Sequence, residues 1–185
     1  SFLAAQYVFL ARGNYDVVYS DGAIFGTNSA YRQNYSDKYP TIGDVTFESL
    51  LSKQSHVLIS ATIARRTSLV RAGLFPTVDL ARPGLHLWLR MAKDGARFGY
   101  CPKQLIKRRG FRETVATDGL SQVEQEKYLF ELIRETIDLS DRDRTHVERH
   151  ISGLEAAMAL EQGTSFLKSG DYSEALTAFR VASHH

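Results

Sequence analysis

Three arginines within five positions, Arg108, Arg109 and Arg112, are the side chains of this sequence best suited to hold a phosphate group. A planar guanidinium group donates parallel hydrogen bonds to two phosphate oxygens, which gives such contacts both strength and direction. The surrounding sequence is also basic, since residues 1–120 carry 16 Lys and Arg against 9 Asp and Glu. A phosphate-bearing ligand and an ordinary solvated basic surface both fit this pattern.

His86 is the candidate for proton transfer, because an imidazole changes its charge near neutral pH. It stands directly before Leu87, Trp88 and Leu89, which are most simply core residues of a helix. A single histidine beside an apolar helix face is also commonly structural. Both roles stay open for His86 at this point.

The elements that would position these residues alternate between helix and strand as far as residue 110, which favours an α/β fold with helices flanking a mixed sheet. Asp21-Gly22 is predicted as a turn, Pro102 as a break between two strands, and residues 27–45 as an irregular loop. Helical spacing predicts helices over residues 2–12, 46–51, 66–72 and 84–94, with Thr46 as a cap and Gly73 and Gly95 as helix ends. Residue types predict strands over 15–20, 97–101 and 104–109, and an extended segment over 57–64.

The sequence from Ser121 onward changes character and predicts an all-helical C-terminal tail over residues 120–185. Ser121 and Glu124 form a capping box, and a further helix is expected from Ser140. A mostly polar linker over residues 111–119 separates this region from a first domain, residues 1–115.

Residues 156–185 match the spacing of one tetratricopeptide-like hairpin, in which small residues lie where two antiparallel helices touch. One such unit cannot bury its apolar face alone. Either further repeats follow it, or the lone hairpin packs on the preceding helices, and two generic amphipathic helices are a third interpretation. The pattern is carried by Gly163, Phe166, Gly170, Tyr172, Ala175, Phe179 and Ala182.

Three segments of the first domain resemble, in their order and spacing, the acceptor-side half of family 2 glycosyltransferases. They are residues 15–21, residues 59–75 and the stretch 84–98, which contains Leu87-Trp88-Leu89-Arg90. The resemblance covers residues 1–115 and implies a partial GT-A fold. It also implies a nucleotide-diphosphate sugar donor and a divalent metal (Mg or Mn) in the full-length enzyme. The sugar would be transferred, with inversion, to a glycan, lipid or protein acceptor.

The resemblance also implies roles for particular residues. In this family a basic residue after the last strand reaches the donor diphosphate, which would be the role of Arg108, Arg109 and Arg112. Asp21, Trp88 and Arg90 complete the expected substrate-binding set. No metal ligand is expected in this chain, because the paired-aspartate motif of the family would precede residue 1.

One position departs from the family pattern. The family's acidic pair, which supplies the base that deprotonates the acceptor hydroxyl, aligns with Pro83-Gly84. Neither side chain can accept a proton. His86 lies two residues later and is the substitute that the sequence offers.

Two classes of function follow. In the first, the chain is part of a glycosyltransferase of bacterial cell-envelope glycan biosynthesis, and is inactive alone because the donor half is absent. In the second, it is a non-catalytic glycan- or protein-binding module whose helical tail recruits a protein partner. The Pro83-Gly84 pair motivates the second class.

Bulk composition limits the partners and the location. A net charge of +2 gives no attraction to nucleic acid, and no apolar run approaches the roughly 18–20 residues of a membrane span. The single Cys101 excludes a disulfide within the chain and fits a reducing compartment. We expect a cytoplasmic protein, or one peripheral to the inner membrane face, that meets a sugar acceptor. Because residue 1 is Ser, the chain is expected to begin inside a longer protein.

Overall fold

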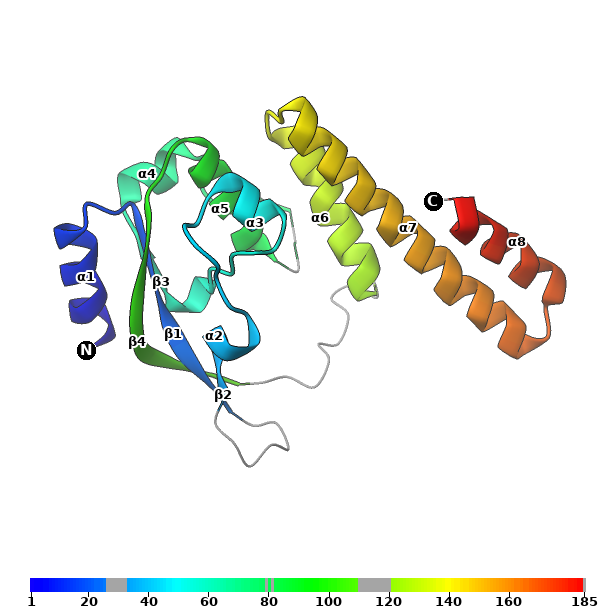
Figure 1. The fold of residues 1–185 in the computed structure, drawn as a ribbon, viewed down its shortest axis with the longest axis horizontal. Coiled ribbons are helices and arrows are strands. Elements are labelled where there is room, and N and C mark those ends of the chain that lie inside the picture. The colour runs from blue at the N-terminus through cyan, green and yellow to red at the C-terminus, as the bar shows by residue number, and fades with distance from the viewer. Residues whose placement is uncertain (26–32, 79, 81, 110–120, 185) are drawn as a thin grey trace. The chain divides into compact units, whose positions relative to one another are not determined.

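The computed structural model describes residues 1–25, 33–78, 80, 82–109 and 121–184. The chain forms two compact units, residues 1–114 and residues 115–185. The first combines a small mixed sheet with flanking helices, and the second is built from helices (Figure 1). We call them the α/β unit and the helical unit. The predicted mixed α/β architecture with a helical C-terminal region is confirmed at this level.

The sheet of the α/β unit is organised around one central strand, β1 (Val17–Phe25). Strand β4 (Phe98–Arg109) runs parallel to β1 along its whole length. Strands β3 (Thr62–Ala64) and β2 (Gln33–Asn34) pair antiparallel with the beginning and the end of β1. The long pairing with β4 therefore brings Arg108 and Arg109 to the end of the sheet where β1 finishes.

Helix α1 (Phe2–Arg12) is attached to one face of the sheet by apolar contacts and by one buried amide. Leu10 forms a core cluster with Val18 and Cys101. Gln6 is fully buried, and its Nε2 donates to Ser20 Oγ at 3.1 Å and to the carbonyl oxygen of Ala61 at 2.8 Å. These contacts identify the side of β1 that faces α1.

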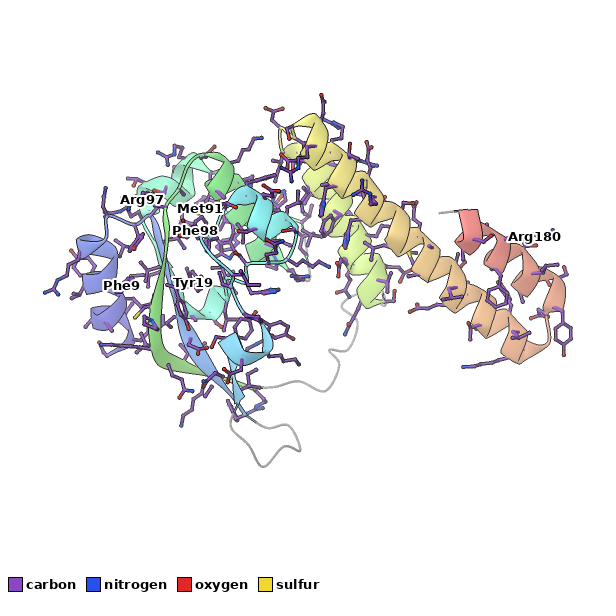
Figure 2. The ribbon with its side chains drawn as sticks, in the orientation of Figure 1. Phe9, Tyr19, Met91, Arg97, Phe98 and Arg180 are labelled. Atoms are coloured by element: carbon purple, nitrogen blue, oxygen red, sulfur yellow. The ribbon has the colours of Figure 1, made fainter. Side chains whose placement is uncertain are left out.

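The opposite face of the sheet meets helix α5 (Pro83–Lys93). Successive strand residues point to opposite faces, so Tyr19 projects away from the side that carries Val18. Trp88 of α5 packs edge-on against Phe98 of β4, with 6.3 Å between ring centroids. Figure 2 labels Tyr19 and Phe98 among the side chains of this layer. Leu87, Leu89 and Met91 of α5 are fully buried, as expected of core residues.

Three short helices and one 3-10 turn complete the α/β unit. They are α2 (Tyr35–Lys38), α3 (Phe47–Leu51), η1 (Ile59–Ala61) and α4 (Arg66–Arg71). Thr46 caps α3 through a bond from Ser49 N to Thr46 Oγ1 of 3.1 Å, as predicted. Gly73 and Gly95 adopt positive φ values of 80° and 78° after α4 and α5, which confirms both predicted helix ends.

Two predicted interruptions of strands are wrong. Strand β1 continues through Asp21-Gly22, and β4 continues through Pro102. Ser20 pairs with Cys101 and Asp21 with Gln104, so Pro102 lies in a register shift where a missing N–H costs no ladder hydrogen bond. Gly22 is needed for packing: a Cβ there would lie 2.8 Å from Ile106 Cγ1.

Two predictions for connecting segments are corrected in part. The loop expected over 27–45 contains β2 and α2, although residues 26–32 lie outside the described residues. The extended segment expected over 57–64 contains η1, and only residues 62–64 pair in the sheet. Short polar segments of this kind take their conformation from tertiary contacts, which local patterns do not reveal.

The helical unit consists of α6 (Gln122–Thr136), α7 (Asp141–Ser169) and α8 (Tyr172–His184). Ser121 and Glu124 form the predicted capping box, with Glu124 N to Ser121 Oγ at 3.2 Å. The N-terminal half of α7 buries Val147 and Ile151, and α6 buries Phe130 and Ile133. His150 Nε2 and Glu126 Oε1 lie 2.8 Å apart across these two helices.

The predicted helix–turn–helix around Gly170 is present. Gly170 has a φ of 90°, and Ala175 of α8 is buried. A Cβ added to Gly163 would lie 2.6 Å from the ring of Phe179, so the small residue lets α7 and α8 approach closely. The repeat-like pattern expected over residues 156–185 begins within α7, which is continuous from Asp141 to Ser169.

Candidate functional site

A cleft of about 200 Å³ opens in the α/β unit beside the first turn of α5. Its walls come from α2, from the segment that follows α3, from α5 and from the end of β4. Residues more than 70 positions apart in the sequence therefore meet there. The lining includes Tyr35, Lys53, Ser55, His56, Arg82, Pro83, Gly84, Trp88 and Arg108.

The charged side chains among the described lining residues of this cleft are cationic. Arg82 and Arg108 both act on Tyr35: burial raises the pKa of the Tyr35 hydroxyl, while the charges of Arg108 and Arg82 lower it. Arg108 also lies over the Tyr35 ring, 5.6 Å from its centroid. Lys53 lines the same cleft and acts on His56. We call this the cationic cleft, and its charge suits an anionic ligand.

His56 is the titratable group of the cationic cleft that can accept a proton near neutral pH. Burial lowers the pKa of His56 below its usual value, and the charge of Arg82 lowers it further, whereas a hydrogen bond with the Lys53 backbone opposes this shift. The imidazole is therefore neutral at pH 7 and can act as a base. Its ring lies 5.5 Å from that of Tyr39, and its backbone N–H donates to Thr41 Oγ1 at 3.2 Å.

The first turn of α5 carries no acidic residue and no side-chain cap. Arg82 occupies the N-cap position, where Ser, Thr, Asp or Asn is usual. Trp88 is 3% exposed, and its buried Nε1–H has no hydrogen-bond acceptor among the described residues. A Cβ added to Gly84 would lie 3.2 Å from that nitrogen. This end of the cleft therefore combines a buried indole N–H with the positive N-terminus of α5.

Two of the substrate-binding residues expected from the sequence, Trp88 and Arg108, line the cationic cleft. Asp21 lies in a neighbouring hollow rather than in the cleft. Its Oδ1 accepts from Gly22 N at 2.8 Å and from Ser36 N at 3.1 Å, and its Oδ2 accepts from Ser36 Oγ at 2.6 Å. The carboxylate of Asp21 thus ties α2 to β1.

The remaining expected site residues lie elsewhere or outside the described residues. His86 is 3% exposed and does not line the cleft. Arg90 Nη2 donates to the carbonyl oxygen of Leu74 and so holds the turn after α4. Arg109 lies over the ring of Phe25, 5.8 Å from its centroid. Arg112 lies outside the described residues.

His56, Arg82 and Lys53 were missed by reasoning from the sequence. No motif surrounds them, and they become neighbours only through the fold. The clearest available signal was Arg82, a cation immediately before the Pro83-Gly84 pair. Among the described residues no group of three or more His, Cys, Asp or Glu side chains could hold a metal ion. The cationic cleft fits the phosphate part of a nucleotide-sugar, and its side chains do not fit a divalent cation.

Comparison with known proteins gives no assignment: no protein-family model matches the chain, and no curated protein matches it. Within the described ranges, no helix is long and apolar enough to cross a membrane.

Proposed function

We propose that the α/β unit supplies the acceptor side of a glycosyltransferase site that uses a nucleotide-diphosphate sugar. The observation that supports this most strongly is the cationic cleft, where Arg82 and Arg108 lie beside the first turn of α5 together with a neutral histidine. Guanidinium groups and a helix N-terminus both favour a diphosphate. The resemblance to family 2 glycosyltransferases over residues 1–115 points to the same ligand.

His56 is the proposed base of this transfer, in place of His86. The acceptor hydroxyl gives its proton to the imidazole of His56, and its oxygen forms a bond to the anomeric carbon of the donor sugar. The bond from that carbon to the diphosphate oxygen breaks, and the diphosphate leaves with the electron pair. Arg82 and Arg108 stabilise the charge that develops on the leaving diphosphate.

The test uses the polypeptide encoded by the complete reading frame and calorimetric titration with UDP, GDP and dTDP. Arg108→Ala is expected to raise the dissociation constant of the bound nucleotide ~10–100-fold, because a hydrogen-bonding group of opposite charge contributes about 1.5–3 kcal/mol. Lys103→Ala is the matched control, since Lys103 is an exposed cation of the same strand outside the cleft.

Turnover of the matching nucleotide-sugars separates binding from catalysis in the same samples. His56→Gln should keep the nucleotide affinity and lose sugar transfer, with loss of the pH dependence that a base imposes. The proposal is wrong if none of the three nucleotides binds the wild-type protein. It is equally wrong if Arg108→Ala and Lys103→Ala bind with the same affinity.

A second candidate function is a non-catalytic binding module whose helical unit recruits a protein partner. The Pro83-Gly84 pair supports it, because neither residue carries a side chain that can accept a proton. Gly84→Asp decides between the two. A carboxylate there would lie at the positive end of α5, and the added Cβ would lie 3.2 Å from Trp88 Nε1 and 3.4 Å from Ile59.

In the complete polypeptide, Gly84→Asp is expected to leave transfer within about threefold of wild type if His56 is the base, since a base is already present. Gly84→Asn is the control, because it has the same shape without a proton-accepting charge. A large gain of transfer in Gly84→Asp, absent from Gly84→Asn, would instead show that the wild-type site lacks a base and would favour the binding module.

A further inference from the structure

A second hollow, of about 210 Å³, adjoins the cationic cleft and shares Tyr35, His56 and Leu58 with it. Four tyrosines drawn from two strands and one short helix line it. We call it the tyrosine hollow. Its lining residues are Tyr19, Ser20, Asp21, Tyr35, Ser36, Tyr39, Pro40, Thr41, Gly43, His56, Leu58 and Tyr100.

The tyrosine hollow has little net charge to offer a ligand. Among its described lining residues the one carboxylate is Asp21, which already accepts three hydrogen bonds from Gly22 and Ser36. Burial raises the pKa of the Tyr19, Tyr35 and Tyr100 hydroxyls, so these phenols are protonated at neutral pH. The tyrosine hollow therefore suits a neutral ligand, whereas the cationic cleft beside it suits an anion.

Aromatic faces and oriented hydroxyls alternate around this hollow. The rings pair as Tyr19 with Tyr100, at 5.2 Å between centroids, and Tyr35 with Tyr39, at 4.9 Å. The Tyr19 hydroxyl is hydrogen-bonded with Thr41, and the Tyr100 hydroxyl with Ser36. A sugar ring presents the complementary chemistry, with C–H groups on its faces and hydroxyls at its rim.

We propose that the tyrosine hollow is a binding subsite for one neutral sugar ring. This inference rests on the proposed function only in that the bound ring would be part of the acceptor. His56 lines both spaces, so a hydroxyl of a ring bound in the hollow would face the proposed base and the phosphate cleft together.

The experiment measures ligand saturation-transfer NMR on the 185-residue chain. The probes are the methyl glycosides of glucose, galactose, mannose and N-acetylglucosamine, each at millimolar concentration. At least one glycoside is expected to bind.

Tyr39→Ala should weaken that binding at least ~10-fold by removing an aromatic face. Tyr100→Phe keeps the ring and the fold, and should weaken it by removing one hydroxyl. Tyr7→Ala is the control, because Tyr7 is 67% exposed on α1 of the same unit.

The outcomes separate this inference from the proposed function. Lys103→Ala should leave glycoside binding unchanged, because Lys103 is an exposed cation of β4 that lines neither space. Glycoside binding with no nucleotide binding would support the sugar subsite and refute the transferase. Nucleotide binding by the complete polypeptide, with none of the four glycosides bound, would refute the subsite alone. Displacement of the glycoside by uridine, or equal binding in all three tyrosine variants, would also refute it.

Discussion

Lowering the pH from 7 to 4 is expected to reduce the free energy of unfolding of the α/β unit by ~3 kcal/mol through His86 alone. Burial, together with the charge of Arg90, lowers the pKa of His86 from 6.5 to about 4. Between these values the unfolded chain binds the proton and the folded chain does not. The stability that neutral His86 contributes is therefore fully present above pH 6.5. It is lost as the pH falls from 6.5 through the folded-state pKa of about 4.

Denaturant unfolding at several pH values between 4 and 7, followed by the fluorescence of the single tryptophan, measures this effect. Trp88 lies in the same helix as His86, so it reports on the α/β unit. His86→Leu removes the titrating group and should flatten the pH dependence. His146→Leu, in the helical unit, should leave it unchanged. If wild type and His86→Leu lose stability in parallel, solvent reaches His86 and the reason for excluding it as the base disappears.

Phe130→Ala is expected to destabilise the helical unit by about 3–5 kcal/mol, a large part of the stability of a small domain. Phe130 is fully buried in α6, and its ring centroid lies 4.0 Å from that of His150 in α7. Truncation removes the free energy that is gained by burying the ring away from water, and it leaves a cavity between α6 and α7. The expected result is a strongly lowered melting temperature of the helical signal.

Thermal melting followed by circular dichroism at the helical band makes this measurement. Tyr128→Ala is the matched control, because Tyr128 is an aromatic residue of the same helix with 41% of its surface exposed. Its melting temperature should change by only a few degrees. Similar shifts in both variants would mean that α6 does not pack on α7 through the Phe130 face in solution.

Local patterns predicted the elements that depend on local chemistry. The cap at Thr46, the capping box at Ser121, and the glycines that end helices at Gly73, Gly95 and Gly170 act within one turn of the chain. Their neighbours in sequence are their neighbours in space, so residue type and spacing are sufficient.

The predictions that failed concern residues whose structural role is set by partners distant in the sequence. Asp21-Gly22 has the composition of a turn, but pairing with β4 and contact with Ile106 keep it in a strand. His56 has no flanking motif, and it enters the site because the segment after α3 folds against the start of α5. His86 attracted attention by its position beside Trp88, yet helical rotation turns it away from the cleft that Trp88 lines.

Helix α7 contacts α6 with its first half and α8 with its second half, and this division has a consequence for how the helical unit tolerates change. His150, whose ring lies against Phe130 of α6, and Gly163, which faces Phe179 of α8, are separated by ~20 Å along the helix axis, at 1.5 Å per residue. Energetic effects at such separations add rather than couple. The two hairpins can therefore accumulate substitutions independently, and the surface that α8 presents can diversify without any compensating change around Phe130.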